Sequence, residues 1–167
     1  MHKFANKLCG KYRKGHFKGV LDVVNRFLEI VRPKYLLLGL KDFQQLILIK
    51  KHILKNKIVT KITSCKTVRE PGGVACSSRN FNLNKNQMKI AKDVFNYLIK
   101  IKKKTKKNLK LFDSSLFKKD LIKIGVNKID YLEIINRKTL KKPKKSNENF
   151  NIFIAYYLNK VRLIDNI

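Results

Sequence analysis

Four short segments combine basic, hydroxyl or amide side chains with glycine or with a second donor, as phosphate-binding sites do. They are residues 15–19 (Gly-His-Phe-Lys-Gly), 39–45 (Gly-Leu-Lys-Asp-Phe-Gln-Gln), 68–73 (Val-Arg-Glu-Pro-Gly-Gly) and 76–80 (Cys-Ser-Ser-Arg-Asn). Lysine, arginine and serine side chains all donate hydrogen bonds to phosphate oxygens. The residue types therefore favour a site for a phosphorylated small molecule.

The segment at 39–45 follows an apolar run and leads directly into a helical pattern. Lys41 then stands beside the free backbone N–H groups of a helix N-terminus, which is an arrangement suited to phosphate. In an open parallel sheet, ligands bind at the carboxyl ends of the strands. Each segment also has a purely structural interpretation, because a strand–glycine–helix junction is often only a turn and a histidine beside glycines is often only a loop residue.

Several common catalytic and metal-binding arrangements are absent from the sequence. It contains neither a Walker loop nor a dinucleotide fingerprint. Its three histidines are too few to support a Ser-His-Asp or Cys-His arrangement, and its three cysteines form no CxxC pair that would indicate zinc or a disulfide framework. The N-terminus lacks the apolar region of a signal peptide, and the apolar stretches are too short to cross a bilayer. We therefore expect a cytoplasmic protein with no metal ligands and no membrane partner.

The elements that must position these segments alternate along the first 66 residues. Apolar residues at helical spacing predict a helix from about residue 20 to 31, which Pro33 ends. The run at 35–38 predicts a short strand buried on both faces, and residues 42–55 return to helical spacing. Residues 58–62 predict a second strand. Helices alternating with strands indicate a parallel α/β sheet.

The composition changes after Thr67, where we place the domain boundary. Residues 68–84 predict a loop, followed by helices over 85–101 and 115–124. Asp113 or Ser114 is suited to cap the second helix, and Gly125 to end it. Residues 129–135 and 151–158 predict two strands, so residues 67–167 form a small α+β domain.

The charge of the chain suggests a different class of partner. Its 167 residues include 40 Lys and Arg against 11 Asp and Glu, giving a formal net charge of +29. A basic nucleic-acid-binding protein is therefore an alternative. The basic residues are mostly lysines spread along the chain, without the interleaved aromatic residues that stack on bases. The lysine-rich stretches at 100–110 and 141–145 thus favour a solvated helix end and a loop, and we expect no specific nucleic-acid partner.

Taken together and in this order, the four segments resemble the pantothenate synthetase (pantoate–β-alanine ligase) family. The run Lys-Asp-Phe-Gln-Gln-Leu at 41–46 with Ser-Ser-Arg-Asn at 77–80 is highly specific, and the ending Val-Arg-Leu-Ile-Asp-Asn at 161–166 is also similar. The resemblance implies a partial Rossmann-like nucleotidyltransferase domain at 1–66, which binds ATP and pantoate. It implies an α+β lid or dimer domain at 67–167.

The resemblance also implies an activity and the residues that carry it out. The family joins pantoate to ATP, and β-alanine then attacks the pantoyl adenylate to give pantothenate, AMP and diphosphate. The implied catalytic residues are His16, Lys41, Ser77, Ser78 and Arg79. The implied ATP-binding residues are Gly39, Leu40, Lys41, Asp42, Val68, Cys76, Ser77, Ser78 and Arg79, and Gln45 is implied to bind pantoate.

The sequence departs from the family pattern in ways that bear on this implied activity. Leu40 stands where the family usually has Glu, and Cys76 where it usually has Met. The His-x-Gly-His signature of the family's N-terminal half does not occur. We therefore expect the C-terminal part of such a ligase, whose Mg²⁺ ligands lie on the missing half and whose partner is a complementing N-terminal half or a second copy. The alternative is a catalytically inactive remnant.

Overall fold

The computed structural model describes residues 2–167, which divide into two compact units between Thr67 and Val68. The first unit contains the short helices η1 (Lys3–Asn6), α1 (Cys9–Tyr12) and η2 (Leu40–Asp42), the longer helices α2 (His16–Val31) and α3 (Phe43–Lys55), and the strands β1 (Tyr35–Gly39) and β2 (Lys61–Cys65). None of the helices within residues 2–167 is both long enough and apolar enough to span a membrane.

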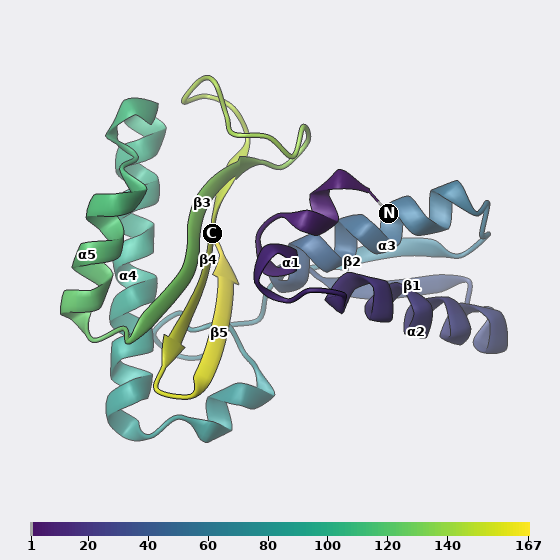
Figure 1. The fold of residues 1–167 in the computed structure, drawn as a ribbon, viewed down its shortest axis with the longest axis horizontal. Helices are drawn as coiled ribbons and strands as arrows, with labels where there is room; N and C mark the ends of the chain where they lie inside the picture. The colour runs from purple at the N-terminus through teal and green to yellow at the C-terminus, as the bar shows by residue number, and fades with distance from the viewer. Residues whose placement is uncertain (1) are drawn as a thin grey trace. The chain divides into compact units, whose positions relative to one another are not determined.

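The first unit is built on a two-stranded parallel sheet, as the alternation of helices and strands predicts. Strands β1 and β2 lie side by side (Figure 1). Their register places Tyr35 opposite Lys61 and Gly39 opposite Cys65. Helix α2 begins at His16, four residues earlier than predicted, and β2 lies three residues later than predicted. The stretch before β2 instead forms a turn at residues 56–57 and an irregular segment at 58–60, in which Thr60 donates a hydrogen bond to the Pro33 carbonyl at 2.7 Å.

The prediction that β1 is buried on both faces is wrong. Side chains alternate along the strand, and Tyr35 and Leu37 are 50% and 65% exposed. The reason is that α2 and α3 pack together on the same face of the sheet, where Leu28, Ile49 and Ile53 form a buried cluster. The partly buried residues around that cluster are Val20, Leu21, Val24, Leu36, Leu38, Ile58 and Ile62.

The second unit is a three-stranded antiparallel sheet with helices against one face. Its elements are η3 (Ser78–Asn82), α4 (Lys85–Lys107), η4 (Leu109–Leu111), α5 (Ser114–Ile124), β3 (Lys128–Asn136), β4 (Phe150–Leu158) and β5 (Val161–Asn166). The strand order is β3-β4-β5, so the chain adds a third strand that the apolar pattern did not predict (Figure 1). Strand β5 is short, and only Leu163 and Asn166 in it are buried, so it lacks a continuous apolar run.

Local capping explains where the helices of the second unit begin and end. Asn84 and Gln87 form a reciprocal capping box at the start of α4. Asp113 accepts hydrogen bonds from the backbone N–H groups of Ser115 and Leu116, and Gly125 adopts a left-handed conformation after α5, both as predicted. Helix α4 continues through most of the lysine-rich stretch, confirming that this stretch is a helix end.

The buried cluster between α4, α5 and the sheet is the main core of the second unit. It contains sixteen buried residues, among them Leu98, Ile101, Leu121, Ile152 and Ile154. Burying side chains of this size stabilises a fold by about 1.5–3 kcal/mol each. This core supports the loop at 68–84, which carries five of the eleven predicted site residues.

Lys102, at the edge of this core, predicts an unusual dependence of stability on pH. Burial, together with the charges of Lys106 and Arg137, lowers the pKa of Lys102 from 10.5 to about 8. The unfolded chain therefore binds more protons than the folded chain between these values, and the free energy of unfolding should rise with pH across that window. Burial is the main cause that raises the pKa values of Tyr97 and Tyr156 in the folded chain. Above about pH 10 the unfolded chain therefore loses these two protons first, and the free energy of unfolding should fall with pH.

The Lys102→Met variant should remove the rise between pH 8 and pH 10. It should also increase the free energy of unfolding at pH 7 by about 1 kcal/mol, after allowing for solvent screening of a half-exposed amine. Urea unfolding followed by circular dichroism at several pH values measures both effects. The exposed neighbour Lys103 supplies the control, since Lys103→Met should leave the pH dependence unchanged; an equal effect of both variants would contradict the prediction.

Candidate functional site

The predicted site residues fall into two groups, one in each compact unit. The first group contains His16, Gly39, Leu40, Lys41, Asp42 and Gln45, and the second contains Val68, Cys76, Ser77, Ser78 and Arg79. The described contacts define the geometry within each group.

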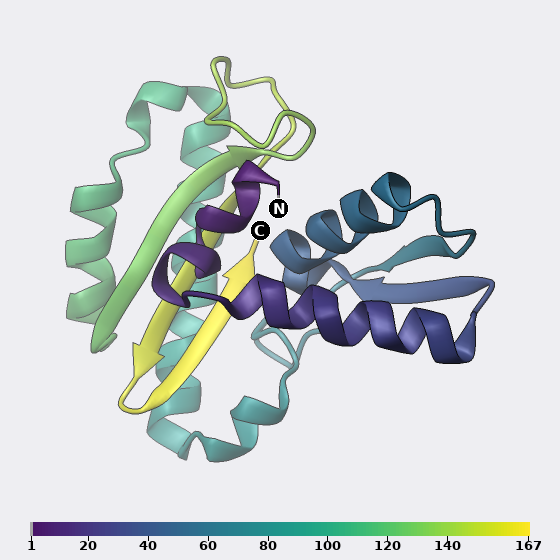
Figure 2. The same ribbon diagram turned by 45° about the vertical axis from the view of Figure 1, so that its right-hand side comes forward.

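The first group gathers at one end of the parallel sheet. The carboxyl ends of β1 and β2 and the amino ends of α2 and α3 all lie at this end (Figure 2). Gly39 is the last residue of β1, and η2 carries Lys41 and Asp42 from the strand into α3. His16 is the first residue of α2, and its Nε2 lies 2.9 Å from the Arg13 guanidinium. These residues therefore lie at the carboxyl ends of the strands, which is the position that the sequence predicts for them.

The start of α3 favours an anionic ligand. Asp42 precedes the helix, and its side chain makes no capping hydrogen bond to the first turn. The first backbone N–H groups of a helix carry a partial positive charge, which Lys41 augments. Lys41 and Gln45 are both partly exposed, so a ligand at this end of the sheet can reach them.

The two neighbouring glutamines of this helix have different roles. Gln44 is 6% exposed, and its side-chain nitrogen donates to the carbonyls of Phe4 and Lys7, each at 2.7 Å. Its side-chain oxygen accepts from the Cys9 N–H at 3.1 Å. Gln44 thus holds the segment before α2 against α3, whereas the side chain of Gln45 is partly exposed.

This contrast predicts that two adjacent substitutions change the free energy of unfolding by very different amounts. Gln44→Ala removes three hydrogen bonds to the backbone of residues 4–9. It should therefore lower the free energy of unfolding of the first unit by about 2–3 kcal/mol. Gln45→Ala should change it by less than about 0.5 kcal/mol. Chemical denaturation of both variants in parallel measures the difference, and equal losses of stability would show that the two roles are not separate.

The second group lies on and after a small hairpin. The N–H of Cys76 donates to the Val68 carbonyl at 3.0 Å, and the N–H of Glu70 donates to the Val74 carbonyl at 2.8 Å. Pro71 and Gly72 occupy its turn, and the left-handed φ of +96° at Gly72 suits a type II turn. The hairpin therefore delivers the following segment, 76–79, from a defined position.

Segment 76–79 presents hydroxyl and guanidinium donors at the start of a short helix. Ser77 caps η3, since its hydroxyl accepts the Arg79 N–H at 3.3 Å. Ser78 and Arg79 are partly or fully exposed, and none of the ion pairs within residues 2–167 involves Arg79. Two hydroxyls and a guanidinium that solvent can reach are suited to phosphate oxygens.

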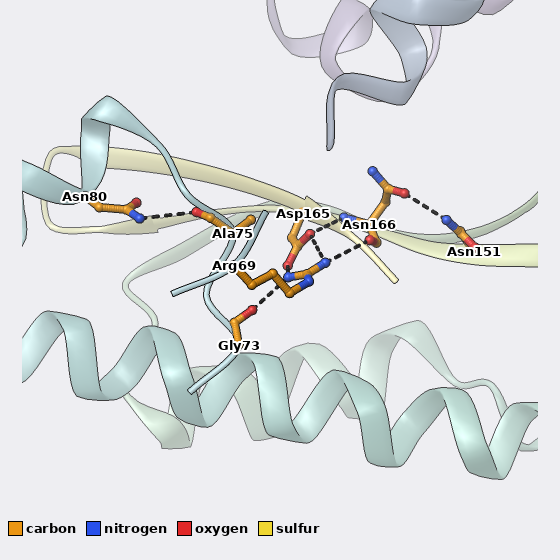
Figure 3. A network of polar contacts seen from close by, with 7 residues as sticks. All are labelled: Arg69, Gly73, Ala75, Asn80, Asn151, Asp165 and Asn166. Atoms are coloured by element: carbon orange, nitrogen blue, oxygen red, sulfur yellow. Dashed lines mark hydrogen bonds and ion pairs between the residues drawn. The ribbon is translucent and has the colours of Figure 1, made fainter. Parts of the chain in front are cut away.

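Two residues that support this segment were not among the predicted site residues. Asn80 is buried, and its amide donates to the Ala75 carbonyl at 3.2 Å. Arg69 forms a paired contact with Asp165 near the chain's end (Figure 3). The sequence signal for Arg69 is its position beside a Pro-Gly turn. Its partner Asp165 lies 96 residues away, so spacing in the sequence could not identify the pair.

The described residues do not supply a magnesium site. No three His, Cys, Asp or Glu side chains come together within residues 2–167 in a way that could hold a metal ion. Magnesium prefers several oxygen ligands, including carboxylates. The acidic residue within the strand-end group is Asp42, which by itself does not form such a site.

The comparisons with known proteins identify what the chain resembles. A family model described as pantoate-beta-alanine ligase matches residues 1–167. Pantothenate synthetase from Flavobacterium psychrophilum is 38% identical over 164 residues, which are 95% of this chain and 57% of the relative. Pantothenate synthetase from Clostridium botulinum is 38% identical over 171 residues, 97% of this chain and 58% of the relative.

Solved structures agree in fold. The crystal structure of pantothenate synthetase from Thermus thermophilus superposes with a TM-score of 0.89 at 26% identity, covering 100% of this chain and 61% of that one. Pantoate-beta-alanine ligase from Francisella tularensis, crystallised with beta-gamma ATP and beta-alanine, gives a TM-score of 0.78 at 35% identity, covering 100% and 56%.

The chain therefore spans under two thirds of the length of these relatives. The likeness confirms the predicted fold class, a nucleotidyltransferase-like α/β portion followed by a small α+β domain. The nucleic-acid-binding alternative has no support in any of these matches.

Proposed function

Because the chain belongs to the pantoate–beta-alanine ligase family, we propose that it contributes to the ATP-dependent condensation of pantoate with β-alanine. In the first step, the pantoate carboxylate attacks the α-phosphorus of ATP, giving pantoyl adenylate and releasing diphosphate. In the second, the amine of β-alanine attacks the adenylate carbonyl, and AMP leaves with the bonding pair. The match of the family model over residues 1–167 carries this proposal.

The residues of the first unit would hold the two substrates of the adenylation step. Lys41 and the amino end of α3 favour the phosphates of ATP, while Gly39, Leu40 and Asp42 line the same strand end. Gln45 offers a donor and an acceptor to the hydroxyl and carboxylate of pantoate. His16 begins the neighbouring helix and would line the same pocket.

The residues of the second unit would also act on the phosphates. Ser77, Ser78 and Arg79 supply hydroxyl and guanidinium donors where diphosphate leaves, and Val68 and Cys76 flank the nucleotide. No side chain serves as a nucleophile; the residues accelerate the reaction by positioning the substrates and stabilising charge at phosphorus. Bound Mg²⁺ would supply further charge neutralisation, and its ligands would come from the portion of the relatives that this chain does not cover.

Exposed apolar residues on the uncovered face of β1 and on α2 support the presence of a partner. Tyr35 and Leu37 stand exposed on β1, and Val23, Phe27 and Ile30 form an exposed stripe at helical spacing on α2. Apolar strands of parallel sheets are normally covered on both faces. We propose that the remaining 39–44% of the relatives' length corresponds to a complementing segment that covers this surface, on the same or another chain, in a cytoplasmic enzyme.

Complementation tests the proposed function. The chain should be co-expressed with the part of the Flavobacterium psychrophilum enzyme that lies outside the matched region. The complex should form pantothenate and AMP from pantoate, β-alanine and ATP, whereas the chain alone should bind ATP weakly and turn over little. A stable complex without activity would contradict the proposed catalysis, and full activity of the chain alone would contradict the need for a partner.

A further inference from the structure

We propose that the ion pair between Arg69 and Asp165 is a positioning device, which holds segment 76–79 in place to receive the phosphates of ATP. This inference rests on the proposed function of that segment. Neither residue belongs to the set expected to touch a substrate. Their role follows from the elements that the Arg69 side chain connects.

Arg69 joins three elements of the second unit (Figure 3). Its two terminal nitrogens donate to the two carboxylate oxygens of Asp165, at 2.7 and 3.0 Å, so the pair is bidentate. One of these nitrogens also donates to the Gly73 carbonyl across the hairpin at 2.8 Å. The guanidinium lies over the Phe95 ring of α4, 4.7 Å from its centre. The hairpin is thereby attached to both the sheet and the long helix.

The anchor point on the sheet is itself well fixed. Asp165 lies in β5, opposite Ile154 of the central strand β4. Its side chain is 10% exposed, and the Arg69 side chain is 24% exposed, so water competes little for the pair. Charge-assisted bidentate contacts of this kind are about twice as strong as neutral hydrogen bonds.

Segment 76–79 is held at both of its ends. Before it, Ala75 bridges to Arg69 in the hairpin, and after it, the buried Asn80 donates to the Ala75 carbonyl. Four residues between two fixed points lose little further conformational entropy when a ligand binds, and this saving favours binding. Release of Arg69 should free the first end and weaken ATP binding without removing any group that contacts ATP.

The second unit offers a matched control pair. Arg162 and Asp130 form an ion pair at 2.8 Å between β5 and β3, with side chains 17% and 3% exposed. This pair resembles Arg69–Asp165 in chemistry and burial, but it joins two strands of the sheet instead of the hairpin and the sheet. Its removal should therefore destabilise the same unit without loosening segment 76–79.

The test compares Asp165→Asn and Arg69→Lys with Asp130→Asn and Arg162→Lys in the full chain. Hydrogen exchange reports the mobility of residues 74–80, ATP titration followed by NMR gives the Kd, and urea unfolding gives the stability. The Asp165 and Arg69 variants should exchange about tenfold faster in 74–80 and bind ATP about tenfold more weakly. The control variants should lose comparable stability while both other readouts stay within about twofold.

Two results would overturn the inference. One is faster exchange with an unchanged Kd for ATP, since the pair would then stabilise the fold only. The other is an equal loss of ATP affinity in the control variants. If the unaltered chain and its complemented form both fail to bind ATP, the proposed function fails instead. If hydrogen exchange of residues 74–80 is unchanged in the Asp165→Asn variant, the anchoring by Arg69 is refuted separately.

Discussion

In the complemented enzyme, Lys41→Met should lower the rate of pantothenate formation by about 10²- to 10³-fold. Lys41 lies in η2, between the carboxyl end of β1 and the first turn of α3. In the proposed reaction, negative charge moves onto the departing diphosphate, and a fixed cation beside it stabilises the transition state more than the ground state. Methionine keeps most of the side-chain volume, so the loss should fall on kcat more than on folding.

The control for this substitution is Lys50→Met, which removes an exposed lysine from α3 itself. The Lys50→Met variant should form pantothenate within about twofold of the rate of the unaltered chain. It measures the effect of a changed net charge alone. Both variants should unfold at the same urea concentration as the unaltered chain. A rate unaffected by Lys41→Met, with the fold intact, would remove Lys41 from the catalytic residues.

Gly73→Ala should destabilise the second unit by about 3 kcal/mol. The φ angle of Gly73 is +90°, and an added Cβ would lie 2.0 Å from the Phe95 ring. A ring packed on α4 cannot move aside as the end of a flexible chain can. The Gly73 carbonyl also accepts from Arg69, so displacing this residue would disturb the hairpin as well.

Gly72 provides a matched comparison for this effect. Its φ of +96° is equally unfavourable for alanine, but the added Cβ would meet only the side chain of Lys92, at 2.8 Å. Gly72→Ala should therefore cost only about 1–2 kcal/mol, mainly from the backbone conformation. Urea unfolding followed by circular dichroism compares the two, and similar losses would show that the Phe95 ring yields.

The sequence was most informative where one local pattern determines one element. Strand β1 and the helices α3 and α5 were predicted to within a residue, because apolar spacing and caps such as Asp113 act over a few residues. The strand-end position of Lys41 and Gln45 followed from the same local order. These features need no knowledge of distant contacts.

Other features depended on contacts far along the chain. Strand β5 pairs with β4 by backbone hydrogen bonds, although its own residues show no run of buried positions. The Arg69–Asp165 pair joins residues 96 positions apart. The exposure of Tyr35 and Leu37 depends on which face of the sheet the helices cover. The apolar sequence of a strand does not show whether one or both of its faces are covered.

Sequence alone also could not separate Gln44 from Gln45. Both stand at the start of α3, and both could bind a ligand by residue type. Their difference arises from rotation around the helix, which turns Gln44 toward the segment at residues 4–9. The resemblance to the ligase family was what selected Gln45.

The unequal cores of the two units have a consequence for the order of folding. Within residues 2–167, the first unit has eleven buried hydrophobic side chains, whereas the second unit has 22. The second unit also has mostly local connections, from α4 through α5 to the β3–β5 meander, and such topologies form quickly. It should therefore behave as the first cooperative folding unit of the chain, with the strand-end group of the first unit consolidating afterwards.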